Sequence, residues 1–438
     1  MAKELKPLLG RWDSAAIIIA IVIGVGIFRV PAEVARYLHS PRVILLAWLT
    51  GGIIVFLGAL CYCELSSSYP KTGGNYIYLK ESYGPGMGFL FGWTELLVIH
   101  TGSVAAVSFI AAEHLLKLSN MSSGLVKPAA ISIVIVVSLI NILSLHHGKR
   151  AQEVLTIAKV VVVFGIIILG FTLGKGSISN FQEISAYRGN GLSMFALALI
   201  PILWVYGGWH ENTFVAGETK DPVRTIPFAL LAATLLITVL YLAINLVYIY
   251  LIPVSEISNT PLIGSEVLSR LFGLKGSRIF DFIIVVFSLG SINATMITGS
   301  RITYAMSKDH PVFSYIGNTS KRYSTPHRAI ALTGLWSAVL IWWGSFNRLL
   351  FFTGILVWIF FALAVSGIFI ARRRFPNMNR PYKVWGYPVV PILFVITCIC
   401  LSANALIFYP VESAFGILIL LSGIPVYLFS KKIKRNMS

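Results

Sequence analysis

The chain is poor in charged residues, especially acidic ones, and contains few cysteines. Charged residues make up 12% of its 438 positions, about half the share found in an ordinary soluble protein. A soluble globular fold is therefore excluded. The four cysteines all lie in apolar runs, and none falls in a loop where an external disulfide could form.

Signatures of enzymes and metal sites are also missing. The sequence has no Ser-His-Asp arrangement, no zinc-ligand spacing and no phosphate-binding loop. The pair Gly24-x-Gly26 lacks the preceding strand that a nucleotide-binding fingerprint requires. We therefore expect a protein that is not an enzyme and that needs no cofactor and no metal.

Long apolar stretches dominate the chain, which is 56% hydrophobic. Twelve runs are each about long enough for a spanning helix of roughly 20 residues, and none carries the cleavage site of a signal peptide. The runs lie at about 12–38, 42–66, 84–112, 128–145, 151–173, 191–216, 228–251, 279–306, 328–345, 348–371, 389–409 and 412–430. The prediction is one membrane domain over residues 1–438.

The net charge of +18 reflects membrane topology rather than nucleic-acid binding. Lys and Arg concentrate in the termini and in alternate loops, which by the positive-inside rule places both termini in the cytoplasm. The basic stretches Arg372–Arg374 and Lys431–Arg435 suit the anionic lipid of that leaflet. We expect a multi-pass protein of the plasma (inner) membrane with lipid, not nucleic acid, around it.

Two apolar runs are broken by glycines, at Ile23-Gly24-Val25-Gly26-Ile27 and at Tyr206-Gly207-Gly208-Trp209. Irregular backbone at membrane depth persists only where protein buries it or where it lines a cavity. Each break lies in the first helix of a half of the chain, and each half, residues 12–173 and 191–371, has five helices. Because five is an odd number, the second half crosses the membrane in the opposite orientation to the first. This arithmetic predicts an inverted repeat with a substrate site between the halves. A simple packing kink is the other interpretation of such glycines.

The first break offers free amides near Ile27 and free carbonyls before Gly24, which suit the carboxylate and ammonium of a zwitterion. At the second break, Trp204, Val205 and Tyr206 precede Gly207, and an aromatic there can close over a substrate. We expect these residues to form the substrate site.

Lys159 is the most telling single charge, since it lies nine residues into the apolar run 151–173. A lysine at that depth is costly and should face the protein interior with a partner. We expect it to contact the carbonyls of the first break or the hydroxyl of Ser291, either as a fixed cation in place of sodium or as a proton carrier. Snorkelling to the interface is the simpler alternative.

Four more polar residues lie deep in apolar runs. Glu95 and His100 fit either a proton relay or a structural hydrogen bond. His210 and Glu211 follow the second break, where they either border the substrate or face a water-filled vestibule. Glu64 and Glu113 lie near helix ends, and we expect no special role for them.

Several motifs resemble those of the amino acid–polyamine–organocation transporters, in particular the L-type amino acid transporter branch. They are Ile23–Phe28 with Pro31, Tyr69–Tyr78, Tyr206–Trp209 with Glu218–Pro222 and Arg224–Pro227, Gly290–Asn293 with Ser300-Arg301, and Arg380–Lys383 with Tyr387-Pro388. Arg29, His210 and Glu211 depart from the usual residues of this family. The likeness extends over nearly the whole chain.

This resemblance implies an all-α membrane protein with twelve transmembrane helices, a LeuT-like 5+5 inverted repeat and two extra C-terminal helices over 389–430. It implies alternating access, backbone binding of an amino acid, and sodium independence through Lys159. Eukaryotic members pair with a glycoprotein through an external cysteine, and Ala111–Lys127 contains none, so we expect no disulfide-linked heavy chain and a prokaryotic transporter. Exchange and proton coupling both stay open, as do polyamine or organic-cation transport and a non-transporting amino acid sensor.

Overall fold

The computed structural model describes residues 9–71, 73–143, 148–182, 191–310, 313–317 and 327–437. Within these ranges the chain is helical, and the one extended pairing is an isolated bridge between Leu9 and Thr219. The helical elements are α1 (Arg11–Val22), η1 (Val25–Phe28), α2 (Val30–Tyr37), α3 (Pro41–Ser68), α4 (Asn75–Tyr83), α5 (Pro85–Thr94), η2 (Glu95–Ile99), α6 (His100–Leu118), η3 (Ser123–Leu125), α7 (Val126–Leu143), α8 (Gly148–Thr172), η4 (Ile178–Gln182), α9 (Gly191–Val205), η5 (Glu211–Glu218), α10 (Pro222–Leu251), α11 (Val254–Ile257), α12 (Ile263–Asp309), α13 (Ser314–Gly317), α14 (His327–Trp343), α15 (Phe346–Arg374), α16 (Val389–Phe408) and α17 (Pro410–Met437).

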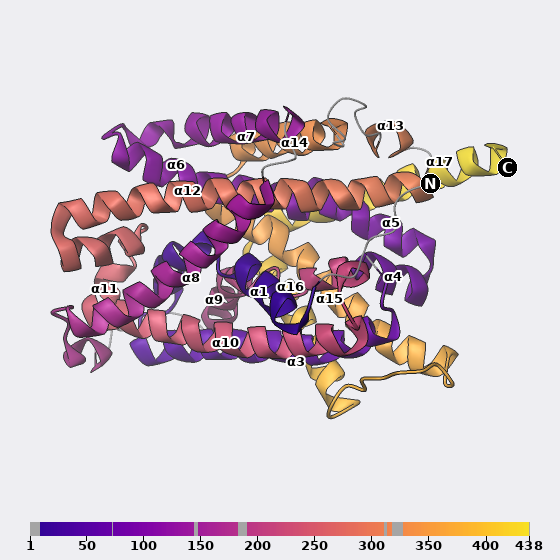
Figure 1. Ribbon diagram of the computed structural model, residues 1–438, viewed down its shortest axis with the longest axis horizontal. Helices are drawn as coiled ribbons and strands as arrows, with labels where there is room; N and C mark the ends of the chain where they lie inside the picture. The colour runs from indigo at the N-terminus through magenta and orange to yellow at the C-terminus, as the bar shows by residue number, and fades with distance from the viewer. Residues whose placement is uncertain are drawn as a thin grey trace.

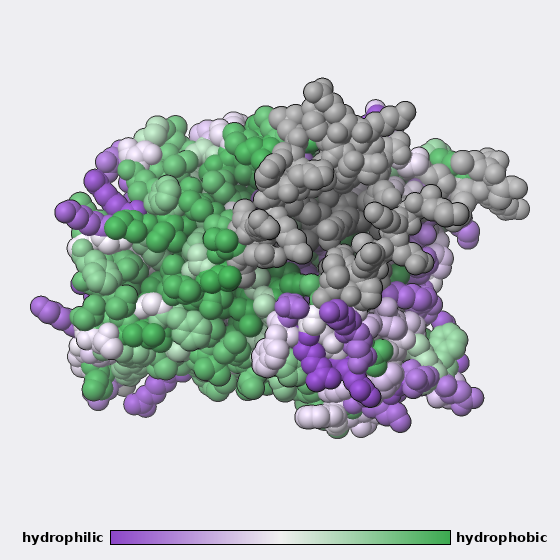
Figure 2. Space-filling model, in the orientation of Figure 1, coloured by the Kyte–Doolittle hydropathy of each residue, from purple (hydrophilic) through white to green (hydrophobic). Residues whose placement is uncertain are grey.

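Eight helical segments in the described part of the chain are long and apolar enough to cross a membrane. They are Pro41–Ser68, Pro85–Leu118, Ser123–Ile142, Pro222–Leu251, Ile263–Met296, Phe346–Arg374, Val389–Phe408 and Pro410–Ile433. The other four expected runs correspond to the interrupted α1–α2 and to α8, α9 and α14, whose apolar parts are shorter. Figure 2 shows a broad apolar face with polar side chains gathered toward its ends, as expected of a multi-pass membrane protein.

Both glycine pairs interrupt their helices. α1 ends at Val22, and the 3₁₀ turn η1 with α2 resumes the path beyond Gly24. α9 ends at Val205, earlier than the run to residue 216 predicted, because Gly208 adopts a positive φ of 91° that no α-helix accommodates. Another correction concerns α12, which begins well before the predicted 279 and is bent at Gly273, where φ is 67°.

The interrupted helices α1 and α9 lie in the middle of the molecule, between α12 with α6 on one side and α3 with α10 on the other (Figure 1). Small residues allow α3 and α10 to approach closely, since a Cβ on Gly52 would lie 2.3 Å from Thr238 Cγ2. The helix α17 is largely exposed, in keeping with a peripheral position. The longer helices thus hold the two breaks at the centre of the fold.

Candidate functional site

A cavity of about 180 Å³ lies between the two helix breaks. The first break contributes Gly24, Val25 and Gly26, while the second contributes Trp204, Val205 and Gly207. The remaining walls come from η2, α6, η5, α12 and α15. Residues from both halves of the chain therefore meet around one space.

In the first break, Gly24, Val25 and Gly26 line the cavity. Ile23 and Ile27 are fully buried and do not line it, although the sequence placed them in the same site. At Gly26 an added Cβ would lie 2.9 Å from Trp204 Cζ3 and 3.2 Å from Val205 Cγ2. Glycine is required there because the two breaks come too close for any side chain.

In the second break, the structure corrects the expectation that Tyr206 forms part of the cavity wall. Its ring is buried against Trp48 and Tyr241, with centroid distances of 6.2 Å and 4.9 Å, and its hydroxyl donates to the Trp48 carbonyl. One residue before the break, Trp204 does line the cavity. Since the chain turns between these two positions, only one of the two aromatic side chains can face the cavity.

Two tyrosines of α10, which sequence reasoning missed, hold the broken ends. The Tyr241 hydroxyl lies 2.7 Å from the carbonyl oxygen of Val22 and 3.3 Å from that of Val205, the last residues of α1 and α9. The Tyr248 hydroxyl lies 3.4 Å from the Ile27 carbonyl oxygen. Carbonyls that lost their helical partners thereby regain donors in the protein interior.

Glu95 and His100 come together through a π-helical turn, η2. In an α-helix, residues five apart point in different directions, whereas a π turn brings i and i+5 into register. The Glu95 carboxylate lies 2.5 Å from His100 Nδ1, both side chains are buried, and both line the cavity. Glu95 and His100 therefore line the cavity while they are hydrogen-bonded to each other.

His210 and Glu211, just after the second break, also line the cavity. The His210 ring is packed edge-on against Phe361 at 4.8 Å, and its Nδ1 atom is buried without a hydrogen-bond partner among the described residues. The partly exposed carboxylate of Glu211 forms no hydrogen bond or ion pair within the described chain. We call Glu95, His100, His210 and Glu211 the cavity cluster.

Lys159 of α8 is buried, with 3% of its surface exposed, and donates a 2.8 Å hydrogen bond to Ser291 Oγ of α12. Of the two expected partners, the structure shows the serine. Ser291 itself lines the cavity, so the ammonium lies one residue behind the cavity wall.

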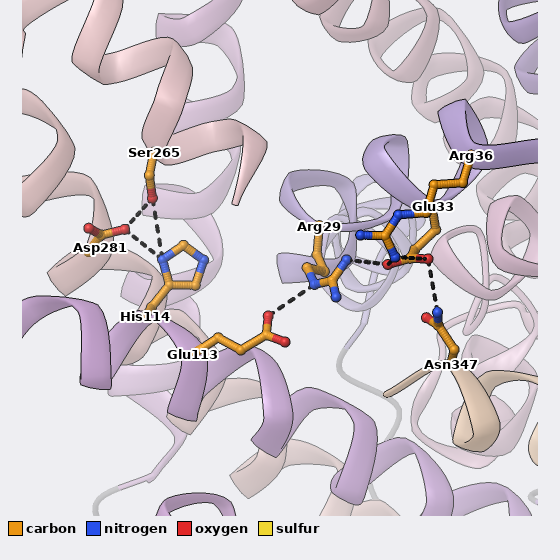
Figure 3. Close-up of polar contacts among 8 residues, drawn as sticks. All are labelled: Arg29, Glu33, Arg36, Glu113, His114, Ser265, Asp281 and Asn347. Atoms are coloured by element: carbon orange, nitrogen blue, oxygen red, sulfur yellow. Dashed lines mark hydrogen bonds and ion pairs between the residues drawn. The ribbon is translucent and has the colours of Figure 1, made fainter. Parts of the chain in front are cut away.

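A second group of charged residues surrounds Arg29, just beyond the first break (Figure 3); Arg29 and Glu33 are buried, Glu113 is partly buried and Arg36 is exposed. We define the Arg29 cluster as Arg29, Glu33, Arg36, Glu113 and Asn347. Arg29 Nη1 lies 2.5 Å from Glu33 Oε1, and its Nε lies 2.9 Å from Glu113 Oε2 on α6. Glu33 also accepts hydrogen bonds from Arg36 and from Asn347 of α15. No special role was expected for Glu113, whereas it pairs with the buried Arg29 in this network.

The Arg29 cluster connects to the cavity through two aromatic rings in edge-to-face contact. The guanidinium lies 4.9 Å from the Phe346 ring centroid, and Phe346 meets Trp204 edge-on at 5.8 Å. Trp204 in turn covers Gly26. Together these contacts close the cavity on the side where α2 lies.

A Ser-His-Asp group between α6 and α12 does not have catalytic geometry (Figure 3). His114 Nδ1 lies 2.7 Å from Asp281 Oδ1, and Ser265 hydrogen-bonds the same carboxylate oxygen. Catalytic serine hydrolysis needs the serine on the other ring nitrogen, whereas here Nε2 is buried without a partner among the described residues. Within the same residues, no group of His, Cys, Asp and Glu could hold a metal ion.

Comparison with known proteins agrees with this architecture. The model of one family, described as amino acid permease, matches residues 9–429. The chain belongs to the amino acid permease family. This membership confirms the resemblance to the amino acid–polyamine–organocation transporters, and because the family consists of transporters, it confirms that the permease is not an enzyme.

Relatives cover nearly the whole permease. It is 29% identical to the serine/threonine exchanger SteT of Bacillus subtilis, over 99% of this chain and 98% of the relative. It is 30% identical to the human b(0,+)-type amino acid transporter 1, over 97% and 88% of the two chains. The human cystine/glutamate transporter is 29% identical, over 97% and 85%. The family and these relatives identify the permease as a multi-pass membrane protein of amino acid transport.

Proposed function

We propose that the permease is a sodium-independent amino acid exchanger of the plasma membrane that works by alternating access. In this proposal twelve helices form a LeuT-like 5+5 inverted repeat over 12–173 and 191–371, with α16 and α17 outside it. Both termini lie in the cytoplasm, so the Arg29 cluster closes the cavity toward the outside. Exchange is favoured over proton symport by the likeness to SteT, an exchanger by name.

The observation that carries the proposal is the meeting of two broken helices at one cavity. The backbone around Gly24–Gly26 and the chain at Val205–Gly207 line the same space. Free amides and carbonyls at broken helix ends bind an α-carboxylate and an α-ammonium, groups that every amino acid shares. Trp204, which covers Gly26, closes over the head group.

Sodium independence is supported by Lys159. Its ammonium is buried and joins α8 to α12 through Ser291. A fixed cation at that position supplies the positive charge that a bound sodium ion otherwise would. We assign Lys159 and Ser291 the role of coupling α8 to the cavity wall.

Proteoliposomes provide the test. Preloaded amino acid should drive uptake of labelled amino acid equally well in sodium and in choline buffer, while matched amines that lack the α-carboxylate should not compete. A requirement for sodium would contradict the role of Lys159. Uptake that follows a pH gradient without internal amino acid would replace exchange by proton symport, and binding without uptake would indicate a sensor.

The variant Gly26→Leu tests the site itself. A leucine side chain would collide with Trp204 and Val205, so we expect loss of substrate-induced thermal stabilisation and of uptake. Gly165→Leu on α8 is the control, because a Cβ there meets no atom within 4 Å. Unchanged substrate affinity in Gly26→Leu would mean that the substrate binds elsewhere.

A further inference from the structure

The side chains around the cavity carry an excess of negative charge. Two carboxylates, Glu95 and Glu211, line it, whereas the lining contains no lysine or arginine. One imidazole, His100, is already bound to Glu95. His100 also acts electrostatically on Glu211, but its hydrogen bond goes to Glu95, so Glu211 has no hydrogen-bonded cation of its own among the described residues.

Two side chains of the cavity lining, Glu211 and His210, have acceptor atoms without a hydrogen-bond partner among the described residues. The Glu211 carboxylate only accepts when ionised, and the Nδ1 atom of a neutral His210 accepts in one of its tautomers. His210 is nine-tenths buried, and Nδ1 has no partner among the described residues. A ligand that donates hydrogen bonds therefore satisfies both side chains. Ammonium and guanidinium groups offer donors only.

Aromatic rings complete the surroundings of Glu211. Trp209, Trp358 and Phe361 line the same cavity, with ring centroids 5.5 Å apart from Trp209 to Phe361 and from Trp358 to Phe361. Aromatic faces attract cations, arginine side chains most often. A carboxylate beside aromatic rings is thus a setting for a cationic side chain, not for an anionic one.

We infer that the permease prefers amino acids with a cationic side chain, such as arginine, lysine and ornithine, and that Glu211 is the residue that selects them. The inference rests on the proposed function, because the helix breaks must bind the α-amino and α-carboxylate groups while the side chain reaches the cavity cluster. It adds a substrate class to that function. Anionic amino acids such as glutamate are excluded by the charge of the wall.

Exchange in proteoliposomes tests this inference with labelled arginine, lysine, serine, leucine and glutamate. Arginine and lysine should show the lowest KM, and glutamate should not be exchanged. Glu211→Gln keeps the shape and removes the charge, so the KM for arginine should rise about tenfold or more, with a smaller rise for serine. Glu211→Asp keeps the charge and should retain the preference even if it lowers the rate.

Glu266→Gln is the matched control, because Glu266 lies on α12 away from the cavity, paired with Arg270. Its KM values should equal those of the wild type. Size-exclusion profiles and thermal stability of each variant establish that it is folded before kinetics are compared.

Several results would overturn the inference while leaving the proposed function intact. Serine or leucine exchanging with a lower KM than arginine is one, and equal KM changes for arginine and serine in Glu211→Gln is another. If a pH gradient drives uptake of neutral amino acids and Glu211→Gln abolishes this uptake, Glu211 is a proton carrier and does not select the substrate side chain. Exchange of no amino acid at all would refute the proposed function and this inference with it.

Discussion

Two groups of charged residues, the Arg29 cluster and the cavity cluster, differ in how completely their members are paired. In the Arg29 cluster two guanidiniums face two carboxylates, and Glu33 accepts from three different side chains. In the cavity cluster only Glu95 and His100 are joined. A buried ion that has its partners stabilises the fold, whereas one without them is held in place by the rest of the structure and is available to a ligand.

The largest effect should follow from removing the centre of the Arg29 cluster. Arg29→Met leaves Glu33 and Glu113 without the cation that lies between them, and the free energy of unfolding should fall by about 3–5 kcal/mol. Denaturation of the purified protein in detergent measures this fall. Arg348→Met is the control, since Arg348 pairs with Glu412 while more than half exposed. A loss under about 1 kcal/mol in Arg29→Met would place the cluster among weak surface pairs.

A matched pair of carboxylates gives the sharpest contrast. Glu33→Gln weakens charge-assisted hydrogen bonds to Arg29, Arg36 and Asn347, and should cost about 1.5–3 kcal/mol of unfolding free energy. Glu211→Gln removes a charge that has no partner, so stability should stay within about 0.5 kcal/mol or increase. The same unfolding measurement serves for both. Equal destabilisation by the two substitutions would erase the distinction between the clusters.

Substitution of Lys159 tests whether a single buried cation is needed for transport or for stability of the fold. Lys159→Ala removes the hydrogen bond to Ser291, and initial exchange rates should fall about tenfold or more, equal to about 1.4 kcal/mol. Ser291→Ala removes one partner but leaves the charge, and should lower the rates less. Exchange at the wild-type rate by folded Lys159→Ala would remove the proposed coupling role.

The smallest effect concerns Asp309, at the end of α12 outside the candidate span. Burial raises the pKa of its carboxyl, but hydrogen bonds from Tyr76 and Lys80 outweigh this and hold the pKa below its usual value. A carboxyl of lowered pKa stabilises the fold above its unfolded pKa, and this contribution is lost as pH falls through the folded value. Since Asp309 and Lys80 are each more than a third exposed, about 0.5 kcal/mol should vanish below about pH 4.

Thermal unfolding over pH 3 to 7 tests this expectation against Asp309→Asn, which should lack that component. Parallel pH curves for the two proteins would show that Asp309 contributes nothing through its charge.

The features that could be predicted from the sequence are those marked by residues that are unusual in an apolar run. Glycine pairs locate both breaks, and a lone lysine identifies Lys159, because each has a cost in a membrane helix that only a special environment offsets. Helix positions followed from run lengths in the same way. The bend of α12 did not, since it depends on the conformation of Gly273, which periodicity cannot show.

Apart from that of Lys159 with Ser291, the contacts between distant segments were not predicted. Arg29 and Glu113 lie 84 residues apart, and nothing local in the sequence indicates that they meet. Glu95 and His100 meet only because η2 is a π turn, and no residue pattern predicts that turn. Tyrosines are common in apolar runs, so Tyr241 carried no sign of its contacts. Tyr206 was misplaced because the direction of a side chain at a break depends on dihedral angles that the sequence does not give.

The hydroxyl of Tyr241 has one proton to share between two carbonyls, those of Val22 and Val205. Its shorter contact is with Val22, and a swing of α1 away from α10 would break that contact while Val205 stays within reach. The hydroxyl could then rotate toward Val205 without becoming unsatisfied. One hydroxyl thereby couples the movements of α1 and α9. A phenylalanine in place of Tyr241 would let each helix move independently of the other.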